Sequence, residues 1–243
     1  MTKKSVISLI SYDAEYLPGS IKTYYDYVDE IILGLDSDRI SWSNNEFSFD
    51  EHKLWSELKS LDKDNKISVV EDNFHKSSVA IENDNYERNF LKEQCTTDWV
   101  FSFDADEYLV NAKDFFYKFC PLVERYKDKV DICMTWATPY KIIEDTILVI
   151  ADEDGTPFLG ENQGVGTSKN STYTYARWTD KSASGSNRIM SPLVSIHWSL
   201  CRDKKDLHTK IHNIGHSDIV ENDPFYSIWD QVTLDNYHTL RNF

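Results

Sequence analysis

The chain has 243 residues, of which 40% are hydrophobic and 14% aromatic, so it can bury a folded core and is not a disordered chain. Its 26 basic and 41 acidic residues give a formal net charge of −15, which disfavours binding to nucleic acid and to anionic membranes. An acidic protein that binds an anionic ligand needs a bound cation or a few local Arg and Lys residues.

The first 110 residues alternate between short apolar runs and helix-like segments. In chain order we predict a strand at 5–10, a helix opened by Pro18, a strand at 30–35, a helix marked by Leu54, Leu58 and Leu61, a strand at 66–70, a helix marked by Tyr86, Phe90 and Leu91, and a strand at 99–103. This alternation is typical of a parallel α/β sheet flanked by helices. We expect a ligand outside the carboxyl ends of these strands, where open α/β sheets bind their ligands.

After residue 110 the pattern changes. We predict, in order, a helix within 114–126, strands at 131–136, 146–150 and 193–198, and a helix over 203–217 that ends near Gly215. The segment 152–186 is rich in Gly, Ser, Thr and Asn, which predicts long loops. No linker is evident, so we expect one domain with two halves.

The cysteines and the N-terminal residues favour a location in the cytoplasm. Cys95, Cys120, Cys133 and Cys201 form no Cys-x-x-Cys pair, and we interpret them as reduced thiols. The N-terminal apolar run, Val6 to Ile10, is too short for a signal peptide or a membrane span. We therefore expect a cytoplasmic protein without a transmembrane segment.

The run "WVFSFDADEYL" takes a buried strand directly into the carboxylates Asp104, Asp106 and Glu107. Two carboxylates at i and i+2 after such a strand repel each other and lose hydration unless a cation lies between them. Mg²⁺ and Mn²⁺ take oxygen ligands and are often shared with substrate phosphates. The alternative is that Asp104 caps a turn while Asp106 and Glu107 begin the next helix. Other Asp-x-Asp copies stand at 36/38, 62/64 and 152/154. The 36/38 copy comes directly after a predicted strand, whereas we interpret 62/64 and 152/154 as solvated loops.

The stretch "NYERNFLKEQCTTDWVFSFDADEYL" (85–109) resembles the signature of family 2-like glycosyltransferases of the GT-A fold, the type that builds bacterial and viral glycans. In that signature an Arg-Asn pair (here Arg88 and Asn89) opens a helix, and an apolar strand then leads to Asp-Ala-Asp-Glu. Residues 5–39 resemble the family's first strand, loop acid, helix and second strand, and 191–217 resemble its C-terminal His segment. The chain departs from the family after the second strand, where "LDSDRISWSNNEFSFDEH" replaces Asp-x-Gly-Ser-x-Asp.

The resemblance implies a GT-A (Rossmann-like) α/β fold with a mostly parallel central sheet flanked by helices. It implies one domain, 1–243, with a nucleotide-sugar-binding half (1–110) and an acceptor-binding half (111–243). The implied activity is metal-dependent transfer of a hexosyl-type sugar, in polysaccharide biosynthesis, from a nucleotide-diphosphate sugar to a hydroxyl of a glycan or glycolipid.

Two other classes of protein are alternatives. A sugar nucleotidyltransferase has similar topology and carboxylates, but its first loop often carries basic residues, and "SYDAEYLPG" (11–19) has none. A non-catalytic carbohydrate-binding protein would suit the seven Trp and fourteen Tyr residues. Such modules are usually β-sandwiches, and the βα alternation argues against one.

The resemblance also assigns roles to individual residues. The implied ligands of Mn²⁺ or Mg²⁺ are Asp104, Asp106 and His197. The implied donor-binding residues are Ser11, Tyr12, Glu15, Asp36, Asp38, Arg88 and Asp104. The alternatives are a turn cap for Asp36, a surface ion pair for Arg88 and a core position for His197. The candidate phosphate contacts are His216, Lys210 and Arg202, whereas we interpret His208 and His212 as solvent-facing.

An inverting transferase needs a carboxylate that takes the proton of the acceptor hydroxyl. Asp180 and Glu161 are the candidates, and we prefer Asp180 because its neighbours Arg177 and Trp178 suit a sugar-stacking site. Both candidates lie in 152–186, which we predict to be a lid that orders over bound donor and excludes water.

Overall fold

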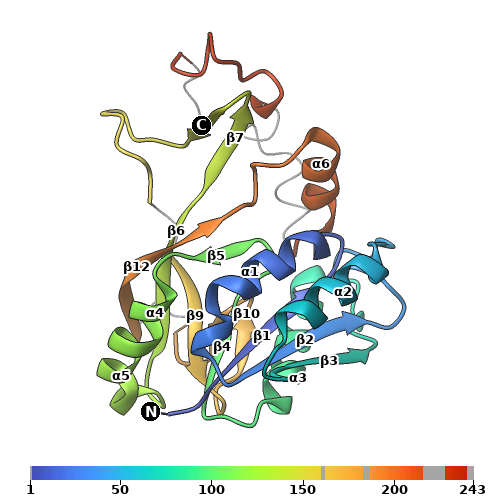
Figure 1. Ribbon diagram of the computed structural model, residues 1–243, viewed down its shortest axis with the longest axis vertical. Helices are drawn as coiled ribbons and strands as arrows, with labels where there is room; N and C mark the ends of the chain where they lie inside the picture. Colours follow the sequence, from blue (N-terminus) through green and yellow to red (C-terminus); the bar gives the residue numbers. More distant parts are fainter. Residues whose placement is uncertain (1, 160–161, 183–186, 216–227, 240–243) are drawn as a thin grey trace.

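The computed structural model describes residues 2–159, 162–182, 187–215 and 228–239 (Figure 1). Its main element is an eight-stranded sheet of order β3-β2-β1-β4-β9-β6-β12-β5. The strands are β1 (Lys4–Ile10), β2 (Glu30–Asp36), β3 (Ile67–Asp72), β4 (Trp99–Ser102), β5 (Glu107–Leu109), β6 (Asp131–Ala137), β9 (Asn162–Ser168) and β12 (Arg188–His197). The helices are α1 (Leu17–Tyr24), α2 (Glu51–Leu61), α3 (Ala80–Gln94), α4 (Ala112–Asp114), α5 (Cys120–Val123) and α6 (Lys204–Asn213).

The two halves of the sheet differ in strand direction. β1 pairs in parallel with β2 and β4, and β2 pairs in parallel with β3. In the other half β6 and β12 are parallel, whereas β9 is antiparallel to β4 and β6, and β5 is antiparallel to β12. The predicted α/β class with helices around a central sheet is confirmed, and the sheet is mixed.

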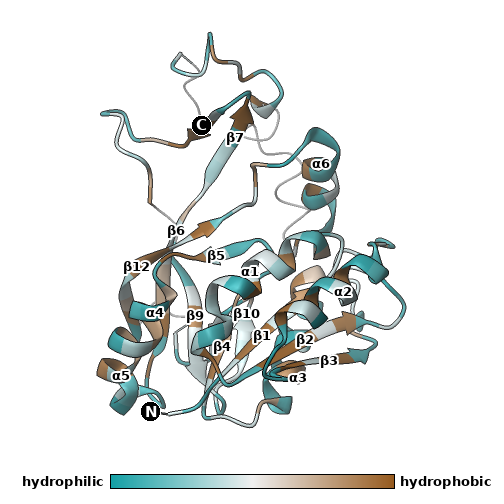
Figure 2. Cartoon of the chain, in the orientation of Figure 1, coloured by the Kyte–Doolittle hydropathy of each residue, from teal (hydrophilic) through white to brown (hydrophobic). Residues whose placement is uncertain are grey.

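Both faces of β1 and β2 are covered, and alternate residues of each of these strands point to opposite sides. On β1, Val6 packs in the cluster that contains residues of α1 and α2, whereas Ile7 packs with Leu91 of α3. The chain alternates apolar strands with helices of mixed polarity, as the colouring in Figure 2 shows. This explains why the continuous apolar runs were visible in the sequence, since a strand buried on both faces needs no polar alternation.

The prediction of long loops over 152–186 is wrong for its central part. β9 lies between β4 and β6 in the middle of the sheet, and it carries Gly164 and Gly166. A Cβ on Gly166 would lie 2.7 Å from the Phe101 ring, and one on Gly164 would lie 2.5 Å from the carbonyl oxygen of Arg177. These glycines allow close packing against an aromatic ring and a neighbouring backbone.

The antiparallel β5–β12 pair contradicts the alternative in which Asp106 and Glu107 begin the next helix. Glu107 is the first residue of β5, so Asp106 and Glu107 do not begin a helix. The Glu107 N–H donates to the Asp104 carbonyl oxygen at 3.1 Å, which closes a tight turn after β4. In the β5–β12 register Glu107 lies opposite His197, and this pairing brings His197 to the carboxylates.

Smaller elements extend this frame. Two short hairpins, β7 (Pro139–Ile143) with β8 (Thr146–Val149) and β10 (Tyr173–Tyr175) with β11 (Trp178–Thr179), lie outside the main sheet.

The four cysteines are buried and free, as predicted. None of the helices in the described ranges has the length and apolar character needed to cross a membrane.

The packing of Gly166 gives a first prediction. Gly166→Ala places a methyl group against Phe101 and should destabilise the fold by about 1–3 kcal/mol through overpacking. Chemical denaturation measures this loss. Gly215→Ala is the control, since a Cβ there would have its nearest neighbours at ordinary distances of 3.7 and 3.8 Å. Equal stability of both variants and the wild type would contradict this account of β9.

Candidate functional site

A cavity of about 830 Å³ opens where β1, β2 and β4 end. Its wall includes Asp13 from the loop after β1, Asp36 from the end of β2 and Asp106 from the turn after β4. The opposite wall comes from later in the chain and includes His197 and Lys210. The predicted location of the site, at the carboxyl ends of the strands, therefore coincides with the large cavity.

Most of the residues predicted for the site line this cavity. They are Ser11, Tyr12, Asp36, Arg88, Asp104, Asp106 and His197. Glu15, Asp38 and Asp180 are exposed and are not among the described residues that line it. Glu161 and His216 lie outside the described residues.

Asp106 is almost fully enclosed, with a side chain that is 1% exposed. Its Oδ2 accepts hydrogen bonds from Arg202 at 2.5 Å and from Lys210 Nζ at 2.6 Å, while its Oδ1 lies 3.7 Å from His197 Nε2. Burial by itself raises the pKa of Asp106. The nearby Lys210, His197 and Arg202 outweigh that effect and hold the pKa well below its usual range, so Asp106 is ionised.

Arg88 on α3 holds the first carboxylate of the motif. Its guanidinium donates to Asp104 Oδ1 at 2.9 Å, to Ser102 Oγ at 2.6 Å and to Asp84, four residues earlier on the same helix. Burial raises the pKa of Asp104, but Arg88 and Arg177 lower it to about 2. The surface ion pair considered for Arg88 is wrong, because its side chain is 3% exposed.

The third carboxylate has its own partner. Arg177 donates to Glu107 through two bonds, at 2.7 and 2.6 Å, and both side chains are buried. Arg177 also donates to the Ser102 carbonyl oxygen at 3.1 Å. Such a bidentate pair fixes both groups geometrically, so Arg177 joins the 176–182 region to the end of β4.

His197 is held as a neutral imidazole. Its ring lies 4.0 Å, centroid to centroid, from the Trp136 ring, and its side chain is 14% exposed. Burial lowers the pKa of His197 to about 3, although Asp106 acts in the opposite direction. Near neutral pH the imidazole therefore keeps a lone pair.

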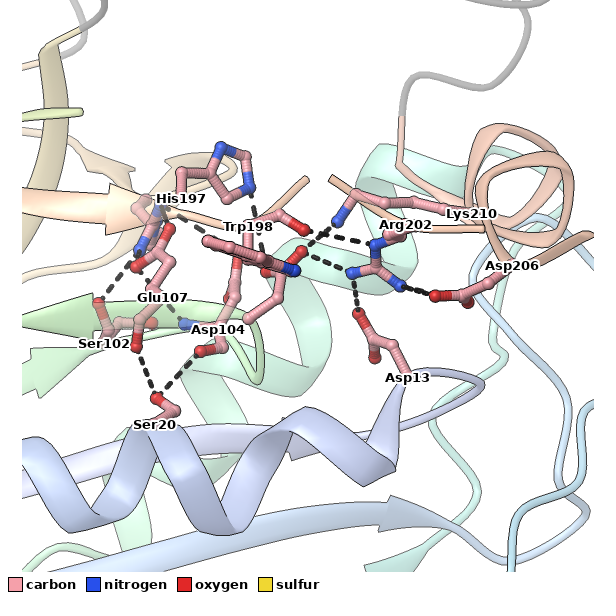
Figure 3. Close-up of polar contacts among 12 residues, drawn as sticks. Asp13, Ser20, Ser102, Asp104, Glu107, His197, Trp198, Arg202, Asp206 and Lys210 are labelled. Atoms are coloured by element: carbon pink, nitrogen blue, oxygen red, sulfur yellow. Dashed lines mark hydrogen bonds and ion pairs between the residues drawn. The ribbon is translucent and has the colours of Figure 1, made fainter. Parts of the chain in front are cut away.

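Arg202 pairs with carboxylates from three parts of the chain, and Figure 3 shows its contacts with Asp13 and Asp206. It reaches Asp13 Oδ2 at 3.3 Å and Asp206 Oδ1 at 3.2 Å, and its guanidinium lies 4.5 Å from the centre of the Tyr16 ring. Figure 3 also shows Lys210 approaching above Arg202, with His197 on the other side of the group.

The donor atoms allow a test of the predicted metal site. The described residues contain no cluster of three or more His, Cys, Asp or Glu side chains arranged to hold a metal ion. Asp106 Oδ1 and His197 Nε2 nevertheless form a carboxylate–imidazole pair, and their separation of 3.7 Å allows one ion at about 2.1 Å from each. Asp104 Oδ2 would be a further ligand only in competition with Arg177, whose Nη2 lies 4.0 Å from it, while Arg88 binds Oδ1. The residues thus fit a divalent ion that takes its remaining ligands from water or phosphate.

Asp36 has the turn-cap contacts that were the alternative to ligand binding. Its Oδ1 accepts the N–H groups of Asp38 and Ile40 at 3.0 Å, and its Oδ2 accepts the Phe74 N–H at 2.7 Å. These bonds fix the start of the loop that departs from the family pattern. Asp38 accepts a bond from Asn73 Nδ2 at 2.8 Å, away from the cavity.

Trp42 and Glu87 are among the residues of the cavity wall that the sequence analysis missed. Trp42 lies in the loop after β2 and donates its indole N–H to Glu87 Oε2 at 2.8 Å. Its ring also lies over Arg88, at 5.4 Å. A signal for this contact was present in the sequence, because Glu87 directly precedes Arg88. A second ionisable residue that is buried on α3 needs a polar partner.

No protein-family model and no curated protein matches the chain. Several solved structures are similar to it. TarS residues 1–349 from S. aureus has a TM-score of 0.45 at 13% identity, covering 96% of this chain and 76% of that one. For 4-diphosphocytidyl-2C-methyl-D-erythritol synthase from Anaerococcus prevotii the TM-score is 0.44 at 14% identity, with coverages of 86% and 94%. For HddC from Yersinia pseudotuberculosis it is 0.43 at 10%, with coverages of 86% and 98%. These TM-scores lie below 0.5, so the assignment of the site rests on its own residues.

The buried Glu87 gives a prediction for pH dependence. Burial raises the pKa of Glu87 from its ordinary value of 4.5 to about 8. The hydrogen bond from Trp42 lowers the pKa but does not offset the effect of burial. Between these pH values the folded chain keeps a proton that the unfolded chain releases, so stability falls as pH rises from 4.5 to 8.

Glu87→Gln removes this titration. The melting temperature of the variant relative to the wild type should rise between pH 5 and pH 8, by at least about 3 °C, and then level off. Glu93→Gln, an exposed change on the same helix, should show no such trend. A constant difference for Glu87→Gln across this range would show that Glu87 is ionised in the fold.

Proposed function

We propose that the chain is a metal-dependent glycosyltransferase that takes its sugar from a nucleotide-diphosphate sugar and transfers it to a hydroxyl of a glycan or glycolipid. The observation that carries the proposal is the pair formed by Asp106 Oδ1 and the neutral His197 Nε2, 3.7 Å apart in a cavity at the strand ends. A carboxylate and an imidazole with free lone pairs suit a divalent ion that is shared with a diphosphate.

The charges around the cavity support a need for that ion. Arg88, Arg177 and Arg202 are each already engaged by at least one carboxylate. A diphosphate brings at least two further negative charges into this partly buried place. When bound, Mn²⁺ or Mg²⁺ supplies Lewis-acid stabilisation of the leaving diphosphate.

The chain's own groups provide the remaining functions. Asp106 and His197 orient the ion, and Trp136 fixes the His197 ring by packing against it. We place the nucleoside beside Tyr12 and Trp42, where the cavity wall is formed by the loops after β1 and β2. Arg88 keeps Asp104 ionised and in position.

A sugar nucleotidyltransferase is the second candidate, because its substrate also carries phosphates and needs a divalent ion. The cations of this cavity lie on α3 and in the C-terminal half, and none lies on the loop after β1. This arrangement favours the glycosyltransferase. Product analysis distinguishes the two, since a glycosyltransferase releases a nucleoside diphosphate and a nucleotidyltransferase releases pyrophosphate. A carbohydrate-binding protein would release neither.

A thermal-shift experiment tests the proposed site. A panel of nucleoside diphosphates should include one that raises the melting temperature by about 5 °C or more at roughly 100 times its Kd, and only with Mn²⁺ or Mg²⁺ present. His197→Asn should remove the metal-dependent part while the fold is retained. His208→Asn, at an exposed position on α6, is the matched control.

His197 is a cleaner test position than Asp106, because Asp106→Asn leaves Arg202 and Lys210 without their shared counter-charge. Stabilisation that persists in EDTA, or an unchanged metal response in His197→Asn, would count against the proposed site.

The proposed general base is tested separately. Asp180 is exposed, is not among the described residues that line the cavity, and its Oδ1 accepts the Thr172 N–H at 3.0 Å, so it would act as the base only if the acceptor extended from the cavity to the β10–β11 hairpin. Asp180→Asn keeps an oxygen for this bond, so stability should stay within about 0.5 kcal/mol. If Asp180 is the base, the Asp180→Asn substitution should lower the rate of transfer roughly 100-fold or more without changing the affinity for the donor. Transfer near the wild-type rate would limit Asp180 to holding the hairpin.

A further inference from the structure

Asp106 has two cationic partners on one oxygen. Its Oδ2 accepts from Arg202 at 2.5 Å and from Lys210 at 2.6 Å, and Arg202 is shared with Asp13 and Asp206. Asp106, Arg202 and Lys210 are largely buried. Two cations on one oxygen repel each other, so one of them has a weaker hold on this position.

The two cations differ in how firmly they are held. Arg202 has a side chain that is 0% exposed, pairs with Asp13 and Asp206 as well as Asp106, and donates to the Trp198 carbonyl oxygen. It would keep most of these contacts if the Asp106 contact were lost. Arg202 is therefore a fixed part of the wall.

Lys210 lies on the last turns of α6 with its side chain 11% exposed, and it lines the cavity. In the described part of the chain its ammonium has one ion-pair partner, Asp106. A lysine head group on a flexible stem can change partners by rotation of its side chain. Lys210 can therefore leave Asp106 while Arg202 stays.

The helix itself is anchored. Ser43 Oγ donates to the Ile214 carbonyl oxygen at 2.8 Å, and Asn45 Nδ2 donates to the His212 carbonyl oxygen at 2.9 Å. The loop after β2 thereby holds the end of α6 in place. A change of partner at Lys210 thus requires movement of the side chain and not of the helix.

We propose that Lys210 is an exchangeable counter-ion of the donor site. In the empty site its ammonium neutralises Asp106, and when the diphosphate enters with its divalent cation, Lys210 leaves Asp106 and binds a diphosphate oxygen. This inference rests on the proposed function, since it concerns the same diphosphate and cation. Lys210 opposes cation binding by itself and supports binding of the cation together with the diphosphate.

The test uses Lys210→Met, with Lys205→Met at an exposed position of α6 as the control. The probes are Mn²⁺ alone, followed by electron paramagnetic resonance of the free ion, and inorganic pyrophosphate at saturating Mn²⁺, followed by calorimetry. Lys210→Met should bind Mn²⁺ alone about ten-fold more tightly than the wild type, because a competing charge near Asp106 is gone. It should bind pyrophosphate about ten-fold more weakly.

Opposite changes in the two affinities are the signature of exchange. A lysine that only supports the fold would weaken both together and lower the melting temperature. Lys210→Arg keeps the positive charge and should leave the affinity for Mn²⁺ alone near that of the wild type, which provides a second readout if Lys210→Met does not fold.

The outcomes separate this inference from the proposed function. If the wild type binds Mn²⁺ and pyrophosphate while Lys210→Met matches it in either affinity, the exchange is overturned and the proposed site stands. If neither the wild type nor any variant binds Mn²⁺, the metal-dependent function fails and the exchange fails with it.

Discussion

The buried carboxylates that follow β4 must be paired with positively charged groups, and the rest of the structure depends on this constraint. Asp106 and Glu107 are almost fully enclosed, and an unpaired charge in such a place is strongly unfavourable. Arg202 and Arg177 supply the compensation from distant parts of the chain. The fold must therefore bring the C-terminal half against the first half.

The β5–β12 pairing shows how the fold achieves this. It places Glu107 opposite His197, and the Trp198 N–H donates to the Asp106 carbonyl oxygen at 2.8 Å. The chain then passes into α6, which carries Lys210 back over the cavity. The same contacts that satisfy the carboxylates thus assemble the candidate site, so its geometry and the stability of the sheet are linked.

How much of this was visible in the sequence depended on the range of each interaction. The strands and helices of the first 110 residues follow local apolar periodicity, and their prediction succeeded. Asp104, Asp106 and His197 line one cavity, and their role as metal ligands stays a prediction. The β9 strand was missed because its glycines look like loop signals, whereas Gly166 is required by the Phe101 ring and Gly164 by the Arg177 backbone.

The ionic partners of the buried carboxylates could not be predicted from local sequence patterns either. Arg177 lies 70 positions after Glu107 and Arg202 lies 96 after Asp106, so no spacing rule connects them. The sequence analysis named Arg202 and Lys210 as candidate phosphate contacts and did not indicate that they neutralise Asp106. Three-dimensional pairing decides which carboxylate oxygens are left for a ligand, and here Oδ1 of Asp106 accepts neither the Arg202 nor the Lys210 bond, whereas Oδ2 of Asp104 lies 4.0 Å from Arg177.

The central claim is that the free oxygen of Asp106 and the neutral His197 hold a divalent ion that is shared with a diphosphate. Anomalous scattering from crystals soaked with Mn²⁺ and the stabilising nucleoside diphosphate tests it directly. The account predicts an anomalous peak within coordination distance of Asp106 Oδ1, His197 Nε2 and at least one phosphate oxygen. A diphosphate bound in the cavity with no such peak, its charge met only by Lys210 and the arginines, would contradict it.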